Sequence, residues 1–467
     1  MHKWSPLVAV CLGTFLLLVD VTIVVVALPA IGEKFGAGYT DLQWVLDGYA
    51  LALAALLLGA GSLADRYGRR RTYLAGIGVF AVSSLLCAVA PNEQALIAAR
   101  ILQGAGGAAM FATTAALLNV TYQGRDRGVA FGIWGAVNGA AAAAGPLAGG
   151  LLTEHFGWRW IFLVNLPVCL AAVWFTVRGV TESKAPSGRF DVPGTVAFTV
   201  TASAVTYGLI RAGDAGWTDP GTLAAFAAGV AALIAFLVIE SRTDHPMLDL
   251  SLFRRAPFAV LITAAFLTQA AAFGYLPFTT VWLQQVLGNG PVDAGLAGAL
   301  PMAAASLVVG AAAGRFLQRV APRWTVGIGL LLIGAGDLLQ ARLGTDSTGA
   351  ALIPGLILVG VGVGSVLPSL SSAVLGQVPR ERSGMAGGAL NTFRQLGFAL
   401  GVAVFGTIFA DRVSDGRPFT DALNVMMTVA AAVALLAGVL VLAVLRRRPA
   451  VVDHSPSGHD QRLASST

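Results

Sequence analysis

The sequence predicts an all-α polytopic membrane protein, with two pseudo-symmetric six-helix bundles and two additional transmembrane helices between them. Three observations predict this fold. The chain of 467 residues is 56% hydrophobic and only 12% charged, whereas charged residues make up about a quarter of a soluble domain. Fourteen apolar stretches follow one another, each about as long as the ~20 helical residues that cross a bilayer. A charged motif also recurs in the two halves of the chain.

The apolar stretches are separated by short polar segments. The expected spans are residues 6–29, 43–64, 73–90, 94–118, 128–152, 160–178, 192–210, 221–239, 257–286, 294–314, 324–342, 351–375, 384–410 and 421–445. Polar stretches near 179–191 and 240–256 divide these spans into groups of six, two and six. The expected domains are an N-terminal bundle at 1–180, a linker with two extra helices at 181–250, a C-terminal bundle at 251–448 and a disordered polar tail at 449–467.

The distribution of basic residues predicts the orientation. If the N-terminus faces the cytoplasm, the inside segments hold 22 of the 30 Lys and Arg residues, and the outside segments hold six. Arg100 and Arg394 remain, both within spans. By the positive-inside rule, both termini are expected in the cytoplasm, with the chain in the cell membrane and in contact with its lipid bilayer. The net charge of +6 is thus an orientation signal, and we expect no nucleic-acid partner.

Several functional classes are disfavoured by what the sequence contains. Cys11, Cys87 and Cys169 lie in apolar spans without C-x-x-C spacing, which indicates buried structural thiols. The five histidines show no ligand spacing, so we expect no metal and no cofactor. The chain has no G-x-x-x-x-G-K-[ST] loop. We therefore expect no nucleotide partner, no ATP-driven pumping and no enzymatic activity within this chain.

One loop motif occurs twice, between the second and third spans of each half. The residues Gly61, Arg66, Arg70, Thr72 and Gly76 recur at a constant offset as Gly314, Arg319, Arg323, Thr325 and Gly329. Such repetition indicates a duplicated bundle, as in transporters that bind their substrate between two halves.

Three ionisable residues of the first half are predicted deep in the membrane. Asp20, Asp47 and Arg100 lie about 9–12 Å from the outer ends of their spans, at 1.5 Å per residue. Each would cost roughly 2.5–3.5 kcal/mol if it faced lipid, so we expect them to share a polar interior. Arginine stays charged, and could hold one carboxylate ionised while burial favours the neutral form of the other. The three residues are therefore a candidate proton-coupling site, and a purely structural ion pair is the alternative.

The second half carries two further intramembrane charges. Asp337 lies little more than a turn from the outer end of its span, so its side chain could reach the interface. Arg394 lies about 15 Å into span 384–410 and is a candidate for substrate contact. Other candidates with amide or aromatic groups, which suit loosely specified apolar ligands, are Asn138, Gln269, Tyr275, Trp282, Gln285 and Asn391. Ordinary helix packing is the alternative for each.

The fifth span combines a proline with many glycines. Pro146 removes a backbone donor and clashes one turn back, so a bend is expected there. The surrounding glycines permit a close partner helix; the set is Gly135, Gly139, Gly145, Gly149 and Gly150. Glycine-rich membrane packing without a special role is the alternative.

Six segments together resemble the major facilitator superfamily, and specifically its fourteen-helix drug:proton antiporters. They are Leu18 to Pro29 (the opening signature), Gly61 to Arg71 (the cytoplasmic motif), Leu96 to Gly107 (the fourth-helix motif), Gly135 to Gly150 (the antiporter motif), Trp158 to Pro167 (the entry to helix 6) and Ser383 to Gly397 (the thirteenth helix). The motifs occur in the expected order and cover both halves. The resemblance implies the major facilitator fold with 14 transmembrane helices.

The resemblance also implies a function. It predicts a proton-coupled antiporter that exports small hydrophobic or cationic organic compounds, including drugs and antibiotics, and confers resistance. Asp20 and Arg100 would couple protonation to movement, and the Gly145–Gly150 bend would favour antiport. A proton-coupled uptake symporter for a small organic solute shares the fold and is the alternative. A non-transporting receptor would need a regulatory domain, which the sequence does not predict.

The cytoplasmic motif would act as a gate. Its residues are Gly61, Asp65, Arg66, Gly68, Arg69 and Arg70. In the related antiporters this motif would hold the halves together at the cytoplasmic face in the outward-open state. Asp65 could do so by accepting an arginine fork or by capping a helix N-terminus. Gln318 stands where the second loop would need the acidic residue, so the two halves are expected to be gated unequally.

Overall fold

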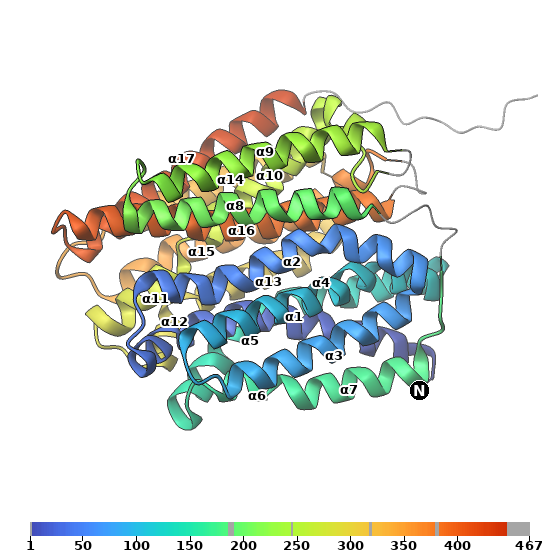
Figure 1. Cartoon of the computed structure of the whole chain (residues 1–467), viewed down its shortest axis with the longest axis horizontal. Coiled ribbons are helices and arrows are strands. Elements are labelled where there is room, and N and C mark those ends of the chain that lie inside the picture. Colours follow the sequence, from blue (N-terminus) through green and yellow to red (C-terminus); the bar gives the residue numbers. More distant parts are fainter. Residues whose placement is uncertain (1, 185–190, 244–245, 317–319, 379–382, 446–467) are drawn as a thin grey trace, which may run out of the picture.

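The computed structural model describes residues 2–184, 191–243, 246–316, 320–378 and 383–445, and all its regular elements are helices (Figure 1). In chain order the α-helices are α1 (Ser5–Phe35), α2 (Tyr39–Tyr67), α3 (Arg69–Ala88), α4 (Glu93–Thr121), α5 (Gly124–Phe156), α6 (Trp160–Leu163), α7 (Asn165–Gly179), α8 (Val192–Ala215), α9 (Pro220–Arg242), α10 (Ala256–Phe273), α11 (Leu276–Val281), α12 (Pro291–Gly298), α13 (Leu300–Phe316), α14 (Pro322–Gln340), α15 (Ile353–Leu375), α16 (Ser383–Ser414) and α17 (Phe419–Val444). A π-helical turn, η3 (Trp282–Val286), follows α11.

The long helices run side by side along the long axis of the molecule (Figure 1). We call the end at which α1 begins the near end, on the right of Figure 1, and the opposite end the far end. Short connections at the two ends make successive long helices antiparallel, as expected for a chain that crosses a bilayer repeatedly.

Eleven helical segments of the described chain are long and apolar enough to cross a membrane, or twelve if α12 and α13 form one span bent by 44°. The protein is therefore an all-helical membrane protein with eleven or twelve candidate spans. The helices α5 and α14, of 33 and 19 residues, fall outside this count. Glycines and Asn138 dilute the apolar character of α5, and Arg323 and Asp337 do the same in α14. Each of the fourteen expected stretches is helical here, but their number as spans remains a prediction.

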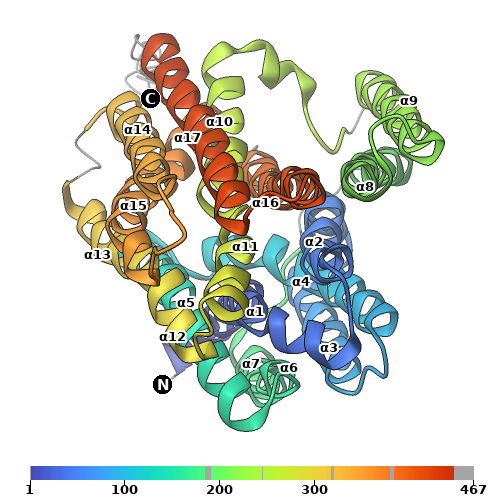
Figure 2. The same ribbon diagram turned by 90° about the vertical axis from the view of Figure 1, so that its left-hand side faces the viewer.

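The helices pack as two groups with a hairpin at their side (Figure 2). We call α1–α7 the N-terminal group and α10–α17 the C-terminal group. Two buried apolar clusters lie in the N-terminal group, and a larger one fills mainly the C-terminal group. The hairpin of α8 and α9 packs on α2 and α16 through a fourth cluster, which contains Phe198 and Phe236. The hairpin thus covers one side of the junction between the groups.

The candidate span Ala256–Val286 of the C-terminal group contains a two-residue interruption. The helix α10 ends at Phe273, Gly274 and Tyr275 follow, and α11 begins with Pro277 in its first turn. Proline cannot donate to the carbonyl one turn back and clashes with it, which explains a break at this point. Pro146, in contrast, lies inside α5, which continues through it as one helix.

Hydrogen bonds between the two groups lie toward the far end in the described part of the chain. The side-chain amide of Gln43 donates to the carbonyl of Val402 at 3.2 Å, joining α2 to α16. That of Gln284 donates to the carbonyl of Val26 at 2.9 Å, joining η3 to α1. The backbone N–H of Val292 lies 3.4 Å from the Glu154 carboxylate, joining α12 to α5. The two groups are thus held together at the far end.

Candidate functional site

A buried ion pair joins the middle of α1 to α4. Asp20 and Arg100 are both 0% exposed, and Nη1 of Arg100 donates a short hydrogen bond to Oδ2 of Asp20. The same nitrogen lies 2.5 Å from Oε1 of Gln103, and Nε donates to the carbonyl of Val45 at 3.1 Å. The ring of Tyr49 lies 4.2 Å from the guanidinium carbon. The buried cation is therefore paired on several sides, as its burial requires.

The other oxygen of Asp20 is held by two amides. Its Oδ1 accepts from Nε2 of Gln103 at 2.9 Å and from Nδ2 of Asn165, on α7, at 3.0 Å. Both amides also lie within 3.3 Å of the Ser84 hydroxyl, on α3. Both carboxylate oxygens are thus paired, and a proton on Asp20 would remove the negative charge that holds Arg100. Helices α1, α3, α4 and α7 meet in this network, so a change at Asp20 reaches most of the N-terminal group.

Asp47 lies apart from this network. The structure brings Asp20 and Arg100 together, whereas neither carboxylate oxygen of Asp47 has a hydrogen bond of normal geometry among the described residues. Asp47 is 0% exposed and lies one turn from Gln43, on the face of α2 that binds α16 through Val402. It is therefore a buried acid near the junction between the groups, separate from the pair at Arg100.

Three members of the network were not predicted as site residues. Gln103 and Asn165 lie inside sequence motifs that the family resemblance already marked, and Gln103 lies one turn from Arg100 on the same face of α4. Those two could have been found from the motifs. Ser84 is a small polar residue in an apolar span, and nothing in the sequence distinguishes it from Ser83 beside it.

The cytoplasmic motif forms the tight turn from α2 to α3. Nε and Nη2 of Arg69 both donate to Oδ1 of Asp65, at 3.0 and 2.8 Å, so Asp65 binds an arginine of its own turn. Gly68 joins the helices with φ of 119°, a conformation that disfavours side chains. The other three members of the motif, Gly61, Arg66 and Arg70, lie on this turn or beside it, with Arg66 exposed.

The N-terminus of α3 is capped by a residue that the sequence did not indicate. The backbone N–H groups of Arg70 and Arg71 donate to the two carboxylate oxygens of Glu182, at 3.1 and 3.2 Å. A carboxylate is favourable at this helix end because the unpaired N–H groups are partially positive. The capping considered for Asp65 is thus performed by Glu182. The corresponding residues of the second loop, 317–319, lie outside the described residues.

The glycines of α5 allow close contacts with both groups. A side chain at Gly149 would meet the carbonyl of Ile23 on α1 at 2.8 Å, and one at Gly145 would meet Thr22. At Gly150 it would meet the backbone of Val292 on α12 at 2.8 Å. The bend predicted at Pro146 does not interrupt α5. Gly135, Asn138 and Gly139 all belong to α5, but their surroundings lie outside what the structure describes.

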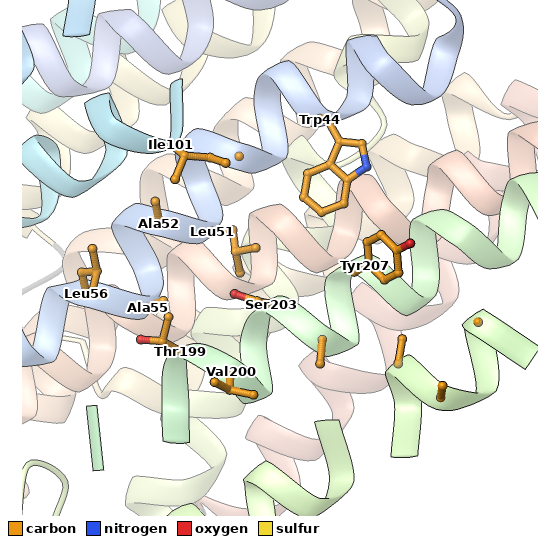
Figure 3. A pocket seen from close by; sticks show the side chains of 15 residues that line it. Trp44, Leu51, Ala52, Ala55, Leu56, Ile101, Thr199, Val200, Ser203 and Tyr207 are labelled. Atoms are coloured by element: carbon orange, nitrogen blue, oxygen red, sulfur yellow. The ribbon is translucent and has the colours of Figure 1, made fainter. Parts of the chain in front are cut away.

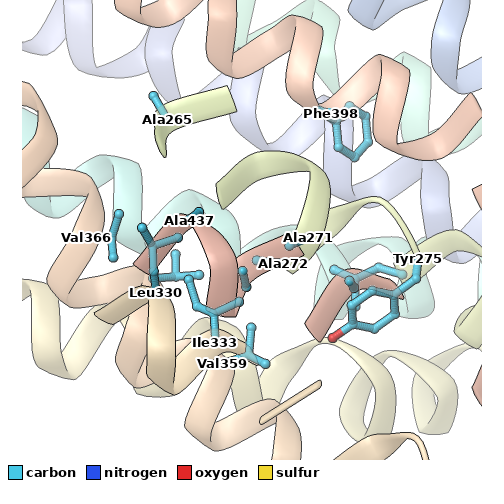
Figure 4. Packing of buried hydrophobic residues seen from close by; sticks show 14 of the residues in the cluster. Ala265, Ala271, Ala272, Tyr275, Leu330, Ile333, Val359, Val366, Phe398 and Ala437 are labelled. Carbon is cyan, nitrogen blue, oxygen red and sulfur yellow. The ribbon is translucent and has the colours of Figure 1, made fainter. Parts of the chain in front are cut away.

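The predicted substrate contacts are dispersed. Tyr275 and Trp282 are 0% and 1% exposed and belong to the apolar cluster of the C-terminal group. Figure 4 shows Tyr275 within this cluster. Gln269 is half-buried and Gln285 is exposed. On α16, Nη1 of Arg394 lies 3.4 Å from Oδ1 of Asn391, while its buried Nε has no hydrogen-bond partner among the described residues.

A second polar cluster lies in the C-terminal group. The hydroxyl of Tyr275 donates to Oδ1 of Asp337 at 3.0 Å and accepts from Nε2 of Gln340 at 3.0 Å. Asp337 is 0% exposed, so it does not reach the interface as the sequence suggested. Packing of α14 against α10, α15 and α17 covers it.

A groove of about 760 Å³ lies between α2, α4 and the α8–α9 hairpin (Figure 3). Trp44 and Tyr207 lie at one end of it, and Leu56 and Val200 farther along. The predicted substrate residues do not line it, and it is separate from the Asp20 network. Its apolar walls suit a site surrounded by lipid.

Comparison with known proteins identifies the family. The sequence profile described as Major Facilitator Superfamily matches residues 10–402, with a second match at 261–466. The chain belongs to this superfamily. Its members are transporters, and the buried charges above therefore lie in a transporter fold.

Similar proteins are resistance and export proteins. The chain is 36% identical over 419 residues to the tetracenomycin C resistance and export protein of Streptomyces glaucescens, covering 89% of this chain and 78% of that protein. It is 36% identical over 410 residues to the multidrug efflux pump LfrA of Mycolicibacterium smegmatis, covering 87% and 81%. It is 36% identical over 417 residues to the puromycin resistance protein pur8 of Streptomyces alboniger, covering 87% and 82%.

A solved structure shows the same fold. The human organic anion transporter MFSD10 (TETRAN) superposes with a TM-score of 0.67 at 18% sequence identity, covering 94% of this chain and all of that chain. At this identity the likeness concerns the fold alone.

Proposed function

We propose that the protein is a proton-coupled antiporter that exports hydrophobic or cationic organic compounds, including antibiotics, across the cytoplasmic membrane and so confers resistance. The observation that carries the proposal is the buried network of Asp20, Arg100, Gln103 and Asn165. A carboxylate held by a permanent cation can exchange a proton for that partner, and the exchange changes contacts on four helices. The resistance and export relatives favour efflux over the uptake alternative.

Proton influx supplies enough free energy for this function. One elementary charge moving down 100 mV provides ~2.3 kcal/mol. At about 1.4 kcal/mol per factor of ten, one proton per uncharged substrate sustains roughly a 40-fold gradient. The carrier needs no cofactor, nucleotide or metal for such exchange.

We further propose that the chain has fourteen spans in a 6+2+6 layout and belongs with the fourteen-helix drug:proton antiporters. The support is that α5 and α14, although less apolar, run between the same two ends as the other long helices (Figure 1). On this reading residues 1–180 and 251–448 are the two bundles and 181–250 the linker hairpin. The near end, which holds the loop of Arg66, Arg69, Arg70 and Arg71, would face the cytoplasm with both termini.

The gate would work by exchange of ion-pair partners. The far end is closed by hydrogen bonds between the groups, while at the near end Asp65 pairs with Arg69 of its own turn. We propose that this loop binds the C-terminal group when the near end closes instead. Close packing of Gly145 and Gly149 on α1 would transmit movement to Asp20. Asp47, buried beside the same junction, would be a further proton-coupling residue.

The substrate would bind between the groups, where Asn138, Gln269, Asn391 and Arg394 are candidate contacts. Tyr275 and Trp282 would contribute only after the C-terminal group rearranges, because both are buried in its core. Gln285, which is exposed, is a further candidate contact.

Proton movement in everted membrane vesicles tests the function. In vesicles with an acidified lumen, addition of a transported compound should release protons from the lumen in proportion to the amount of protein. Asp20→Asn should abolish this release, and Asp415→Asn, at an exposed position of the α16–α17 connection, should not. Release by the Asp20 variant equal to that of the native protein would refute the proton site. Substrate that moves with protons, rather than against them, would establish uptake.

A further inference from the structure

Asp337 is a buried acid without a countercharge. It is 0% exposed, its Oδ1 accepts from the Tyr275 hydroxyl, and its Oδ2 has no hydrogen-bond partner among the described residues. An isolated ionised carboxylate in an apolar interior is far too costly to persist, so such a group becomes neutral instead. The charge of Asp337 therefore depends on whether the residues around it provide a cation.

The helices packed against Asp337 provide no cation. The sequences of α10, α11 and α15 contain no charged residue, and the charged residue of α17, Asp421, pairs with Arg412 at 3.4 Å. On α14 itself the other charge is Arg323, fourteen residues away or about 21 Å along the helix. Arg342, just past α14, is exposed. Tyr275 is the titratable group that faces Asp337, and it binds as a neutral donor.

Tyr275 lies at the break between α10 and α11. Its hydroxyl is fixed from both sides, by Asp337 and by the Gln340 amide at 3.0 Å, and its ring packs against Phe405 of α16. Beyond the break, α11 packs on α1, and Gln284 of η3 donates to Val26 of α1. The cluster thus holds the turn between α10 and the segment of α11 and η3, and this segment contacts α1 at the far end.

Asp337 lies close to the far end of the molecule, so opening of that end would expose it to water. Asp337 lies three residues from that end of α14. Toward the near end, α14 presents Leu330 and Ile333 to a packed apolar core with Val359 and Val366 (Figure 4), and these four side chains offer no group that could relay a proton.

We propose that Asp337, Tyr275 and Gln340 form a second proton-binding site, loaded from the far side, whose neutral form stabilises the far-end-closed conformation. When the far end opens, Asp337 meets water and releases its proton, because an aspartic acid in water is ionised above about pH 4. Closing takes up one proton on Oδ2, and the Tyr275 hydroxyl returns to Oδ1. The proton goes back to the far side, so this site regulates closure and adds nothing to the protons exchanged for substrate. Its role in transport rests on the proposed antiport, but its protonation does not.

The conformational equilibrium tests this site directly. Spin labels on cysteines at the exposed far-end positions Phe156 and Val286, in a chain without its native cysteines, report the distance between the groups in lipid nanodiscs. Since closure binds a proton, the closed-to-open ratio should fall by up to tenfold per unit rise in pH. Asp337→Asn should remove the share of this slope that belongs to Asp337. The same slope in Asp337→Asn and the native chain would overturn the proposal.

Two further variants separate proton binding from packing. Tyr275→Phe retains the carboxyl and the ring, so it should keep the pH slope while lowering the closed fraction several-fold at every pH. Asp415→Asn, exposed at the far end, should match the native protein. In infrared spectra of the full chain at neutral pH, the Asp337→Asn variant should lose one C=O stretching band of a protonated carboxylic acid. An unchanged band would contradict a neutral Asp337, whatever the outcome of transport assays. If the native protein couples transport to protons but Asp337→Asn changes neither the pH slope nor the infrared band, only this second site is rejected and the proposed antiport stands.

Discussion

The two groups of helices hold polar clusters at corresponding places but differ in the partner of their buried carboxyl group. The offset of 253 residues that aligns Gly61 with Gly314 also aligns Ser84 with Asp337, and both are members of their buried clusters. In the N-terminal group the carboxylate is on α1 and is bound by Arg100. In the C-terminal group it is on α14 and is bound by a tyrosine. The duplicated scaffold thus preserves a polar position, while of the two buried carboxyls only that of Asp20 is paired with a cation among the described residues.

Glycine packing, in contrast, is the same in both groups. Gly145 and Gly149 of α5 pack on α1, and Gly397 and Gly401 of α16 pack on α10 with the same spacing. The packing of the helix backbones is therefore more similar between the two groups than their buried polar residues are.

The largest effect is expected from Arg100→Ala. The change leaves Asp20 buried without its cation, which should cost about 3–5 kcal/mol of stability and abolish transport. In the double variant with Asp20→Asn, most of the stability should return while transport stays absent. Thermal unfolding of the purified variants measures the first effect, and vesicle assays measure the second. If the double variant is no more stable than Arg100→Ala, the two residues do not act as an ion pair.

The two acids should respond differently to neutralisation. Asp20→Asn leaves Arg100 unpaired and should lower the free energy of unfolding by several kcal/mol. Asp337→Asn replaces a neutral acid by a neutral amide and should change it by no more than ~1 kcal/mol. Unfolding curves for the two variants, recorded under identical conditions, give the comparison. Equal losses would mean that the two carboxyls have the same charge.

The glycine contacts should be equally sensitive in both groups. A methyl group at Gly149 meets the Ile23 carbonyl at 2.8 Å, and one at Gly401 meets Cα of Ala270 at 2.8 Å. Alanine at either position should therefore cost ~1–3 kcal/mol. At Gly78 on α3, where a methyl group meets nothing within 4 Å, alanine should be neutral or stabilising by ~0.5–1 kcal/mol. A large difference between the losses in unfolding free energy at Gly149 and Gly401 would contradict equivalent glycine packing in the two groups.

The smallest effect on stability is expected at the gate. The Asp65 side chain is 45% exposed, so Asp65→Asn should cost at most ~1 kcal/mol. Turnover should still fall several-fold without loss of substrate binding, because the loop loses its charge for the alternative conformation. Gln318→Ala, at the corresponding position of the second loop, should leave turnover unchanged. Equal effects of both variants on the transport rate would indicate that the halves are gated equally.

The sequence was sufficient to predict the helices and the ion pair. Apolar stretches of spanning length require helices in lipid, and an aspartate and an arginine at one depth have few other ways to be buried. The arginine at Asp65 could be predicted because both residues belong to one short loop.

The rest depends on how helices rotate and lean against one another. Asp47 was counted at the same depth as Asp20, but it lies on the face of α2 that contacts α16. The depth of a residue along its helix does not specify the direction of its side chain. Ser84 and Glu182 act through partners about 20 and 110 residues away, which no local pattern shows. Asp337 was expected near the interface because its distance from the helix end was counted, whereas its burial comes from the neighbouring helices.

The most direct test of proton coupling at Asp20 compares two kinds of transport in proteoliposomes. Exchange of labelled for unlabelled substrate needs only movement between the two conformations, whereas accumulation driven by a pH gradient also needs the proton site. For Asp20→Asn the account predicts that exchange continues at a rate within several-fold of the native one and that gradient-driven accumulation is lost. Accumulation by this variant at the native level would contradict the assignment of the buried network as the site of coupling.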